Sequence, residues 1–119
     1  MATVLIIDDS SFMRKRIGNA VRQAGHKVIG TAKDGAEGFD LYTELRPDLV
    51  IMDITMRGID GIQAASMIRE QDPDARILFM SLVTDPEVIS RAQELGAIDF
   101  LGKNDSEKLS RIMDGLGKQ

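Results

Sequence analysis

The chain contains no cysteine, no tryptophan and only three prolines among its 119 residues. Without cysteine it can form neither a disulfide framework nor a thiolate metal site, which fits a cytoplasmic protein. No apolar run reaches the roughly 18 residues that a membrane span requires. The N-terminus also lacks the basic and then apolar layout of a secretory signal. The net charge of −4 argues against direct nucleic-acid binding, which favours a basic surface. Membrane insertion, secretion and nucleic-acid recognition are therefore not expected.

Short apolar runs alternate with longer amphipathic stretches along the whole chain. The runs lie at 4–7, 28–30, 49–52, 77–80 and 97–101. The first, third and fourth are continuously apolar, which is typical of strands covered on both faces of a parallel sheet. Apolar residues in the other stretches recur with helical spacing, beginning with Phe12, Met13 and Ile17. This alternation predicts one flavodoxin-like, doubly wound α/β domain over residues 1–119. Its five-stranded parallel sheet should have the order 2-1-3-4-5.

Helix-capping signals support these boundaries. A capping residue stands three positions before Glu or Gln at Asp34, Asp60 and Thr84. Gly25 and Gly96 follow the first and fourth helical stretches, where a left-handed residue commonly ends a helix. The predicted connections are short, and no low-complexity stretch or second domain is expected.

Polar residues follow four of the five predicted strands. In this kind of sheet, ligands bind beyond the carboxyl ends of the strands, near the switch in strand order. The residues that leave the sheet at this edge are Asp8, Asp9, Asp53, Ser81 and Lys103. Three converging carboxylates repel one another unless a cation lies among them, and an all-oxygen ligand set suits Mg²⁺. We therefore expect a magnesium site, with the lysine on the opposite side.

This set of residues suits phosphoryl transfer. The reaction needs positioning and neutralisation of the phosphoryl oxygens, which a divalent cation, the Lys103 ammonium and the Ser81 hydroxyl would supply. A carboxylate can be the covalent acceptor, and Asp53 at the end of the central strand is the candidate. Taken alone, each of these residues has a simpler interpretation as a cap, a turn residue or a solvated surface lysine. Their joint placement at the strand ends favours a site.

At these residues the chain resembles a response-regulator receiver domain, the CheY-like family, over essentially its full length. The shared motifs are Val4–Ser10, Asp53–Met56 followed by Asp60-Gly61, Ser81, and Phe100 with Lys103. The resemblance implies a phosphoprotein of two-component signal transduction that is a phosphorelay switch rather than an enzyme. Its donor would be a phosphohistidine on a sensor histidine kinase or a histidine phosphotransfer protein. The phosphoryl group would be lost by slow self-hydrolysis.

The resemblance also implies a role for each residue at the metal. Asp53 would accept the phosphoryl group. Asp9, Asp53 and the backbone carbonyl of Thr55 would ligate Mg²⁺ directly, and Asp8 would act through water. Lys103 would pair with a phosphoryl oxygen.

Two further residues would transmit the effect of phosphorylation to the protein surface. Ser81 would move toward the phosphoryl group and draw the following loop with it. Phe100 would be an aromatic switch that turns inward with Ser81, or else a permanently buried core residue. A downstream target would then bind the face formed by the fourth helix, the fifth strand and the fifth helix.

Three residues depart from the family pattern. Arg57 and Asn104 stand where the family usually has proline, and Leu82 stands where it usually has a small residue. A cis bond before Asn104 would cost about 2.5–4 kcal/mol, so we expect a trans bond, with Asn104 capping the last helix. Leu82 is expected to narrow access to the acceptor. Neither Thr55 nor Val83 carries a carboxylate or amide that would orient water, which predicts a long-lived phosphoryl group.

Three other classes of protein stay open. A phosphatase similar to the haloacid dehalogenases would have a second Asp, acting as general acid–base, at the position where this chain has Thr55. A flavin-binding protein would want a Ser, Thr or Gly-rich loop after the first strand, where Asp8 and Asp9 would repel a flavin phosphate. A phosphorylation-independent interaction module of the same fold would tolerate the three departures, but the intact carboxylate set argues against it.

Overall fold

The computed structural model describes residues 1–82 and 85–116, which form a parallel sheet with helices on both faces. The strands are β1 (Thr3–Ile7), β2 (Lys27–Ala32), β3 (Leu49–Asp53), β4 (Ile77–Ser81) and β5 (Asp99–Gly102). The helices are α1 (Ser11–Gln23), α2 (Gly35–Leu45), α3 (Gly61–Gln71), α4 (Pro86–Glu94) and α5 (Ser106–Leu116). The strand order is β2-β1-β3-β4-β5, which confirms the predicted α/β fold and order.

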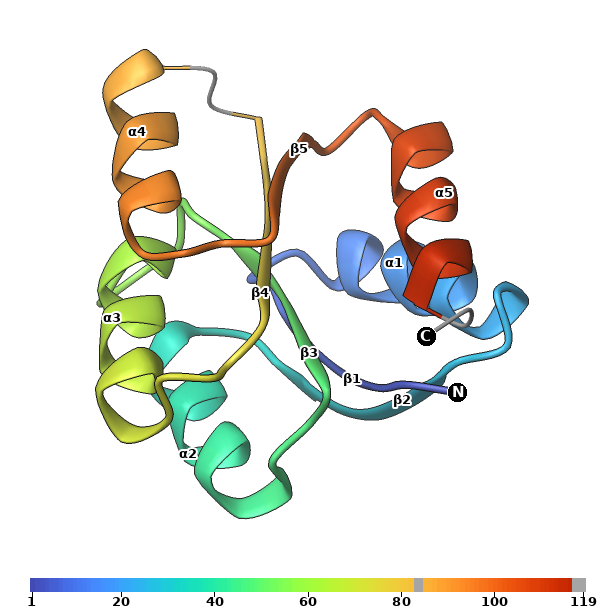
Figure 1. Ribbon diagram of the computed structural model, residues 1–119, viewed down its shortest axis with the longest axis horizontal. Helices are drawn as coiled ribbons and strands as arrows, with labels where there is room; N and C mark the ends of the chain where they lie inside the picture. Colours follow the sequence, from blue (N-terminus) through green and yellow to red (C-terminus); the bar gives the residue numbers. More distant parts are fainter. Residues whose placement is uncertain (83–84, 117–119) are drawn as a thin grey trace.

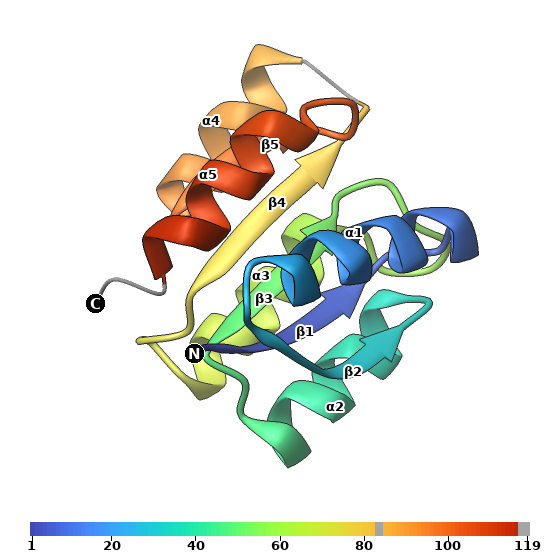
Figure 2. The same ribbon diagram turned by 90° about the vertical axis from the view of Figure 1, so that its right-hand side faces the viewer.

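Helices α1 and α5 cover one face of the sheet, and α2, α3 and α4 cover the other (Figures 1 and 2). Successive residues of β1 therefore enter different cores. Val4 and Ile6 pack with the side chains of α1 and α5, whereas Leu5 and Ile7 pack with those of α2 and α3. All four are 0% exposed. This explains why the strand is continuously apolar instead of alternating.

The strand register brings the carboxyl ends of the central strands to the same level. Ile7 of β1 pairs with Met52 of β3, so the residues that follow them, Asp8 and Asp53, are neighbours. Asp53 in turn pairs with Met80, one residue before Ser81. The predicted site residues of three strands therefore meet at one edge of the sheet.

The predicted caps at Asp34 and Asp60 are confirmed. Asp34 accepts a hydrogen bond from the Glu37 N–H, and Asp60 forms a capping box with Gln63. The side chain of Asp85 caps α4 by accepting a hydrogen bond from the Glu87 N–H. Thr84 itself lies outside the described residues.

The ends of the last two strand–helix units also differ in part from prediction. The strand predicted from residue 97 begins at Asp99, because the Ala97 N–H bonds back to the Ala92 carbonyl and ends α4. Gly96 has the expected positive φ, 76°, in that ending. Asp105, and not Asn104, caps α5, accepting a hydrogen bond from the Lys108 N–H at 3.1 Å.

His26, which directly precedes β2, has a buried side chain with two hydrogen-bond partners. Its side chain is 5% exposed. The Nδ1 atom accepts a hydrogen bond from the Ala2 N–H at 2.9 Å, and Nε2 lies 2.5 Å from the Met113 carbonyl. With Nδ1 accepting, Nε2 carries the proton and donates to that carbonyl. The imidazole therefore connects the N-terminus, the α1–β2 turn and α5.

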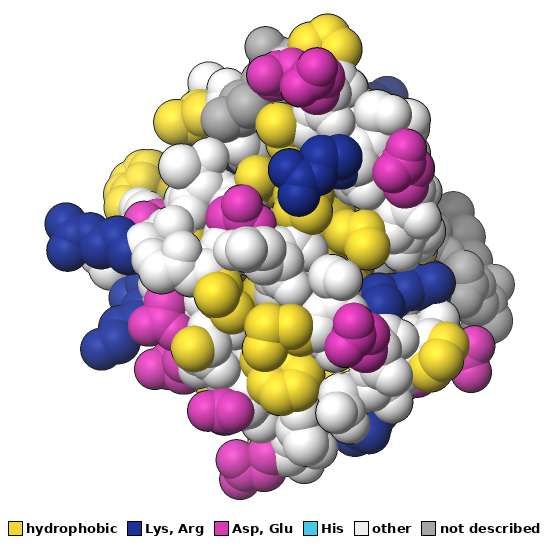
Figure 3. All heavy atoms as spheres, turned by 90° about the vertical axis from the view of Figure 1, so that its left-hand side faces the viewer, with side chains coloured by type: hydrophobic (Ala, Val, Ile, Leu, Met, Phe, Trp, Pro, Cys, Tyr) yellow, Lys and Arg dark blue, Asp and Glu magenta, His cyan; other side chains and the backbone are white. Residues whose placement is uncertain are grey.

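The outer surface is mixed in character. On the side of α3 and α4, hydrophobic side chains form small groups separated by acidic and basic ones (Figure 3). Phe12, which the helical spacing assigned to the apolar side of its helix, is 69% exposed. Within the part of the chain that the structure describes, no helix combines the length and apolarity that crossing a bilayer requires.

Candidate functional site

Asp8 is held in place by the backbone around it. Its N–H donates to the Ala32 carbonyl of β2 at 3.0 Å. One carboxylate oxygen, Oδ1, accepts the Ser10 N–H at 2.9 Å, and Nη1 of Arg14 donates to the Asp8 carbonyl at 2.7 Å. Asp8 is 1% exposed, so these bonds fix a buried carboxylate at the end of β1.

The three predicted metal-ligating carboxylates are brought together. Each of Asp8, Asp9 and Asp53 offers an oxygen, and these oxygens all lie within 4.8 Å of one another. Asp8 and Asp53 are buried, whereas Asp9 is exposed. The cluster therefore has a closed side against the sheet and an open side toward solvent.

Lys103 approaches this cluster from the buried side. Its Nζ lies 3.0 Å from Oδ2 of Asp8 and 3.2 Å from Oδ2 of Asp53. Burial alone would lower the pKa of Lys103, but the hydrogen bonds and charges of the two carboxylates outweigh it and raise that pKa. Lys103 is therefore a charged, buried counter-ion to both carboxylates.

The charge balance leaves Asp53 with a raised pKa. Burial and the neighbouring charge of Asp8 raise the pKa of Asp53 to about 6, against the lowering effects of Lys103 and of the Thr55 N–H. Three carboxylates face one lysine, so one positive charge is not enough to neutralise the cluster. A cation among the carboxylates would remove this deficit.

The donor set fits Mg²⁺. Opposite ligands in a magnesium octahedron lie about 4.2 Å apart, so a small contraction, or one carboxylate acting through water, accommodates the observed spacing. The buried Oδ2 atom of Asp8 is close to Lys103 but accepts no hydrogen bond within the described residues. Such an atom is suited to a further cation or to a water bound to one. The predicted ligation by the Thr55 carbonyl stays a prediction.

The two predicted switch residues occupy different surroundings. Ser81 ends β4, is 1% exposed, and its carbonyl accepts the Lys103 N–H at 3.1 Å. Phe100 is half-buried, and its ring centroid lies 6.5 Å from that of Phe79, with a tilt of 45°. The ring also borders a cavity between α4 and β5, so space lies beside it. Their movement stays a prediction.

The departures from the family pattern lie around the site. The Lys103–Asn104 bond is trans, as predicted, like every other peptide bond of the described residues. Leu82 is 70% exposed and borders a cavity with Ser81, Lys103 and Asn104.

Arg57 is exposed beside a separate cavity that also reaches Asp9. Val83, whose side chain entered the prediction of a long-lived phosphoryl group, lies outside the described residues.

Sequence reasoning missed two basic residues near the cluster. Arg14 was not among the predicted site residues, yet it donates a hydrogen bond to the Asp8 carbonyl. Lys33, which follows β2 directly, borders the same cavity as Arg57. Its position after the strand next to β1 was the signal that could have identified it, because that strand ends at the same edge of the sheet.

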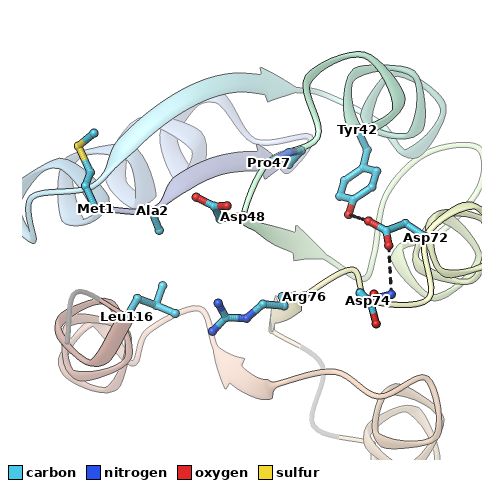
Figure 4. A pocket seen from close by; sticks show the side chains of 9 residues that line it. All are labelled: Met1, Ala2, Tyr42, Pro47, Asp48, Asp72, Asp74, Arg76 and Leu116. Atoms are coloured by element: carbon cyan, nitrogen blue, oxygen red, sulfur yellow. Dashed lines mark hydrogen bonds between the residues drawn. The ribbon is translucent and has the colours of Figure 1, made fainter. Parts of the chain in front are cut away.

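A cavity of about 360 Å³ lies near the amino ends of β1 and β3, bordered by Tyr42, Asp48, Asp72 and Arg76 among others (Figure 4). Its polar groups already serve the fold. The Tyr42 hydroxyl donates to Asp72 at 2.7 Å, and Asp48 accepts the Thr3 N–H at 2.8 Å. These bonds lower the pKa values of Asp72 and Asp48. These carboxylates stabilise the turns around the cavity, whereas the candidate site lies at the opposite edge of the sheet.

Known proteins are similar to this chain in sequence and in fold. A family model described as the response regulator receiver domain matches residues 4–114. Protein CcdB of Bacillus subtilis is 40% identical over 118 residues, which cover 99% of this chain and 97% of that protein. The chemotaxis protein CheY of Thermotoga maritima is 39% identical over 115 residues, covering 97% of this chain and 94% of that protein. A solved CheX–CheY complex with BeF3 and Mg²⁺ from Borrelia burgdorferi aligns with a TM-score of 0.89 and 35% identity, over 96% of this chain and 88% of that one.

Proposed function

Because this chain belongs to the response-regulator receiver domain family, we propose that it is a phosphorylation switch whose acceptor is Asp53. The observation that carries the proposal is the buried contact of Lys103 with Asp8 and Asp53, beside a cluster of three carboxylates. The donor would be a phosphohistidine on a sensor histidine kinase or a histidine phosphotransfer protein. By likeness to the CheY relatives, the protein would act in the cytoplasm.

Each residue of the site would have a distinct role in phosphoryl transfer. An Asp53 oxygen attacks phosphorus, and its ionised form is the nucleophile. Without metal its carboxyl pKa is raised to about 6, and a bound cation would favour the ionised form. Lys103 neutralises one phosphoryl oxygen, and Ser81 would donate to another. Asp8, Asp9 and the Thr55 carbonyl would hold Mg²⁺, which neutralises the remaining charge when bound. Asp53 would share in that ligation.

Phosphorylation would then shift a conformational equilibrium. A phosphoryl group on Asp53 would favour a conformation in which Ser81 moves toward it and Phe100 turns inward. The cavity of about 270 Å³ bordered by Ile89, Ala92 and Phe100 gives the α4–β5 region space for such a movement. A downstream target would recognise the face of α4, β5 and α5.

The test is the intact mass after incubation with Mg²⁺ and acetyl phosphate, beside an Asp53→Ala control. We expect a phosphoryl adduct that requires Mg²⁺ and is absent from the control. If there is no adduct, the experiment is repeated with a phosphohistidine protein donor, since Leu82 borders the site. Failure with both donors would favour the phosphorylation-independent interaction module instead.

We also propose that the phosphoryl group is long-lived, since the side chain of Thr55 cannot orient a water as a carboxylate or amide can. Self-dephosphorylation would then take minutes or longer. The measurement is the decay of the purified adduct in Mg²⁺ after removal of the donor. A decay time of seconds would contradict this part of the proposal while leaving the acceptor role intact.

A further inference from the structure

A cavity of about 520 Å³ opens on the solvent side of the carboxylate cluster and is bordered by Asp9, Lys33, Asp34 and Arg57. Lys103 contacts the cluster from the buried side. We propose that Lys33 and Arg57 form a second cationic subsite, which holds the anionic leaving group of a small acyl-phosphate donor. This inference rests on the proposed acceptance of a phosphoryl group at Asp53 and adds the class of donor.

The position of Lys33 is set by the end of β2. The Ala32 carbonyl accepts the Asp8 N–H at 3.0 Å, which joins the exit of β2 to the exit of β1. On the other side, Asp34 caps α2 by accepting the Glu37 N–H at 2.8 Å. Lys33 lies between these two fixed points, and its side chain is exposed. It is therefore held at the rim beside Asp9.

The position of Arg57 is set by the loop after β3. Met56 before it is 9% exposed and belongs to the core, while Gly58 after it has a positive φ of 78°. The same loop packs on the start of α2, where a Cβ on Gly35 would lie 2.7 Å from the Ile59 side chain. This close approach brings the Arg57 loop and the β2–α2 connection to one cavity. A proline at position 57 would offer no cation there.

Neither of these cations is neutralised by an ion pair. Within residues 1–82 and 85–116, Lys33 and Arg57 form no salt bridge. An oxygen of Asp34 is occupied by the cap of α2, and Asp9 would face the metal. Once a divalent cation engages Asp9, the cavity presents the two positive groups of Lys33 and Arg57 against the single carboxylate of Asp34, so its net charge toward an incoming anion is positive.

The positive charges of Lys33 and Arg57 would favour phosphoryl transfer when the donor is an acyl phosphate. An Asp53 oxygen forms a bond to phosphorus, the bond from phosphorus to the acyl oxygen breaks, and its electron pair leaves on a carboxylate. No oxidant, reductant or proton is needed. Negative charge grows on the leaving oxygen, so cations beside it stabilise the transition state more than the ground state. Phosphoramidate differs, because its protonated nitrogen leaves as neutral ammonia.

The experiment compares the two donors in saturating Mg²⁺, with intact mass measuring the phosphorylation rate. The variants are Arg57→Ala, Lys33→Ala and their combination. The control is Arg111→Ala on the exposed surface of α5, which matches the charge change of each single variant. We expect the combined variant to lose about tenfold in rate with acetyl phosphate and less than twofold with phosphoramidate. Arg111→Ala should keep both rates. Unchanged rates, or equal losses with both donors, would overturn the proposal.

A second readout does not depend on transfer. Phosphonoacetate resembles acetyl phosphate but cannot give up its phosphoryl group, and it carries a carboxylate where the anionic leaving group would stand. Its binding is followed by NMR shifts of backbone amides. The combined variant should bind it several-fold more weakly than wild type and Arg111→Ala, and equal affinity would overturn the proposal. If wild type accepts a phosphoryl group from neither donor, the proposed function fails, and this binding comparison still decides whether the subsite exists.

Discussion

Removing the charge of Asp53 should stabilise the fold when no divalent cation is present. The carboxyl pKa rises from 3.8 to about 6 in the folded state. The folded protein therefore holds this proton more tightly than the unfolded chain, and the free energy of unfolding falls as pH rises from about 4 to about 6. A shift of about two pKa units corresponds to about 3 kcal/mol in the free energy of unfolding. This stabilisation is present at low pH and is lost once the pH rises above about 6. The side chain is 3% exposed, so solvent screening is weak.

The variant Asp53→Asn keeps the shape and cannot ionise. At pH 7 in EDTA, we expect it to be up to about 3 kcal/mol more stable than wild type, with the difference shrinking toward pH 4. The assay is urea unfolding followed by far-UV circular dichroism across this pH range. Mg²⁺ should remove most of this difference, since a ligand at 100 times its Kd stabilises wild type by about 2.7 kcal/mol and the variant by less.

Asp40→Asn, an exposed change on α2, is the matched control and should alter stability by less than about 0.5 kcal/mol. The reasoning would be refuted if Asp53→Asn were no more stable than wild type at pH 7 in EDTA. It would also be refuted if the advantage did not depend on pH.

Other predictions concern packing and titration. Gly61→Ala should lower the free energy of unfolding in urea by about 3 kcal/mol. The new Cβ would lie 2.7 Å from the Ile54 Cα and even closer to the Asp53 carbonyl oxygen. His26→Ala should cost about 2–4 kcal/mol, because it leaves two buried backbone groups unpaired and opens a cavity. Tyr42 is the only tyrosine, so ultraviolet absorbance should report its ionisation near its raised pKa of about 12, and Asp72→Asn should lower that value.

Each of these has its own check. Gly115→Ala, on α5 with nothing within 4 Å of the new Cβ, should instead stabilise by about 0.5–1 kcal/mol, so equal losses at both glycines would contradict the packing argument. A cost below about 1 kcal/mol for His26→Ala would mean that water replaces both bonds. A Tyr42 midpoint near pH 10 in protein that is still folded would rule out the burial and the Asp72 bond as its environment.

The fold was predictable because its determinants are local and periodic. Continuous apolar runs specify strands covered on both faces, and helical spacing between them specifies the covering layers. Parallel strands then bring their carboxyl ends together, so Asp8, Asp53 and Lys103 could be assigned to one site before any distance was known. The contacts of Lys103 at 3.0 and 3.2 Å need more than this topology, because β4 separates β5 from β3, and they depend on the reach of the lysine side chain.

What escaped prediction depends on contacts between residues far apart in the chain. The hydrogen bonds of His26 join residues 2 and 113, and no local pattern encodes such a pairing. The subsite at Lys33 and Arg57 depends on the packing of Gly35 on Ile59, which involves two different connections. Helix starts were ambiguous where two capping residues are adjacent, as at Asn104 and Asp105. Only the hydrogen bond to Lys108 decides between them.

The imidazole of His26 gives α5 a fixed end. The bond to Met113 anchors the last turn of this helix, while its first turn follows the loop that carries Lys103. From Ser106 to Met113 the helix rises about 10 Å, so a rotation of about 10° around the anchored end moves its start by about 2 Å. If α5 moves on phosphorylation, we expect it to turn as a rigid body about the contact with the imidazole. A small displacement at the phosphoryl group would be expressed at the near end of α5, and the far end would hardly move.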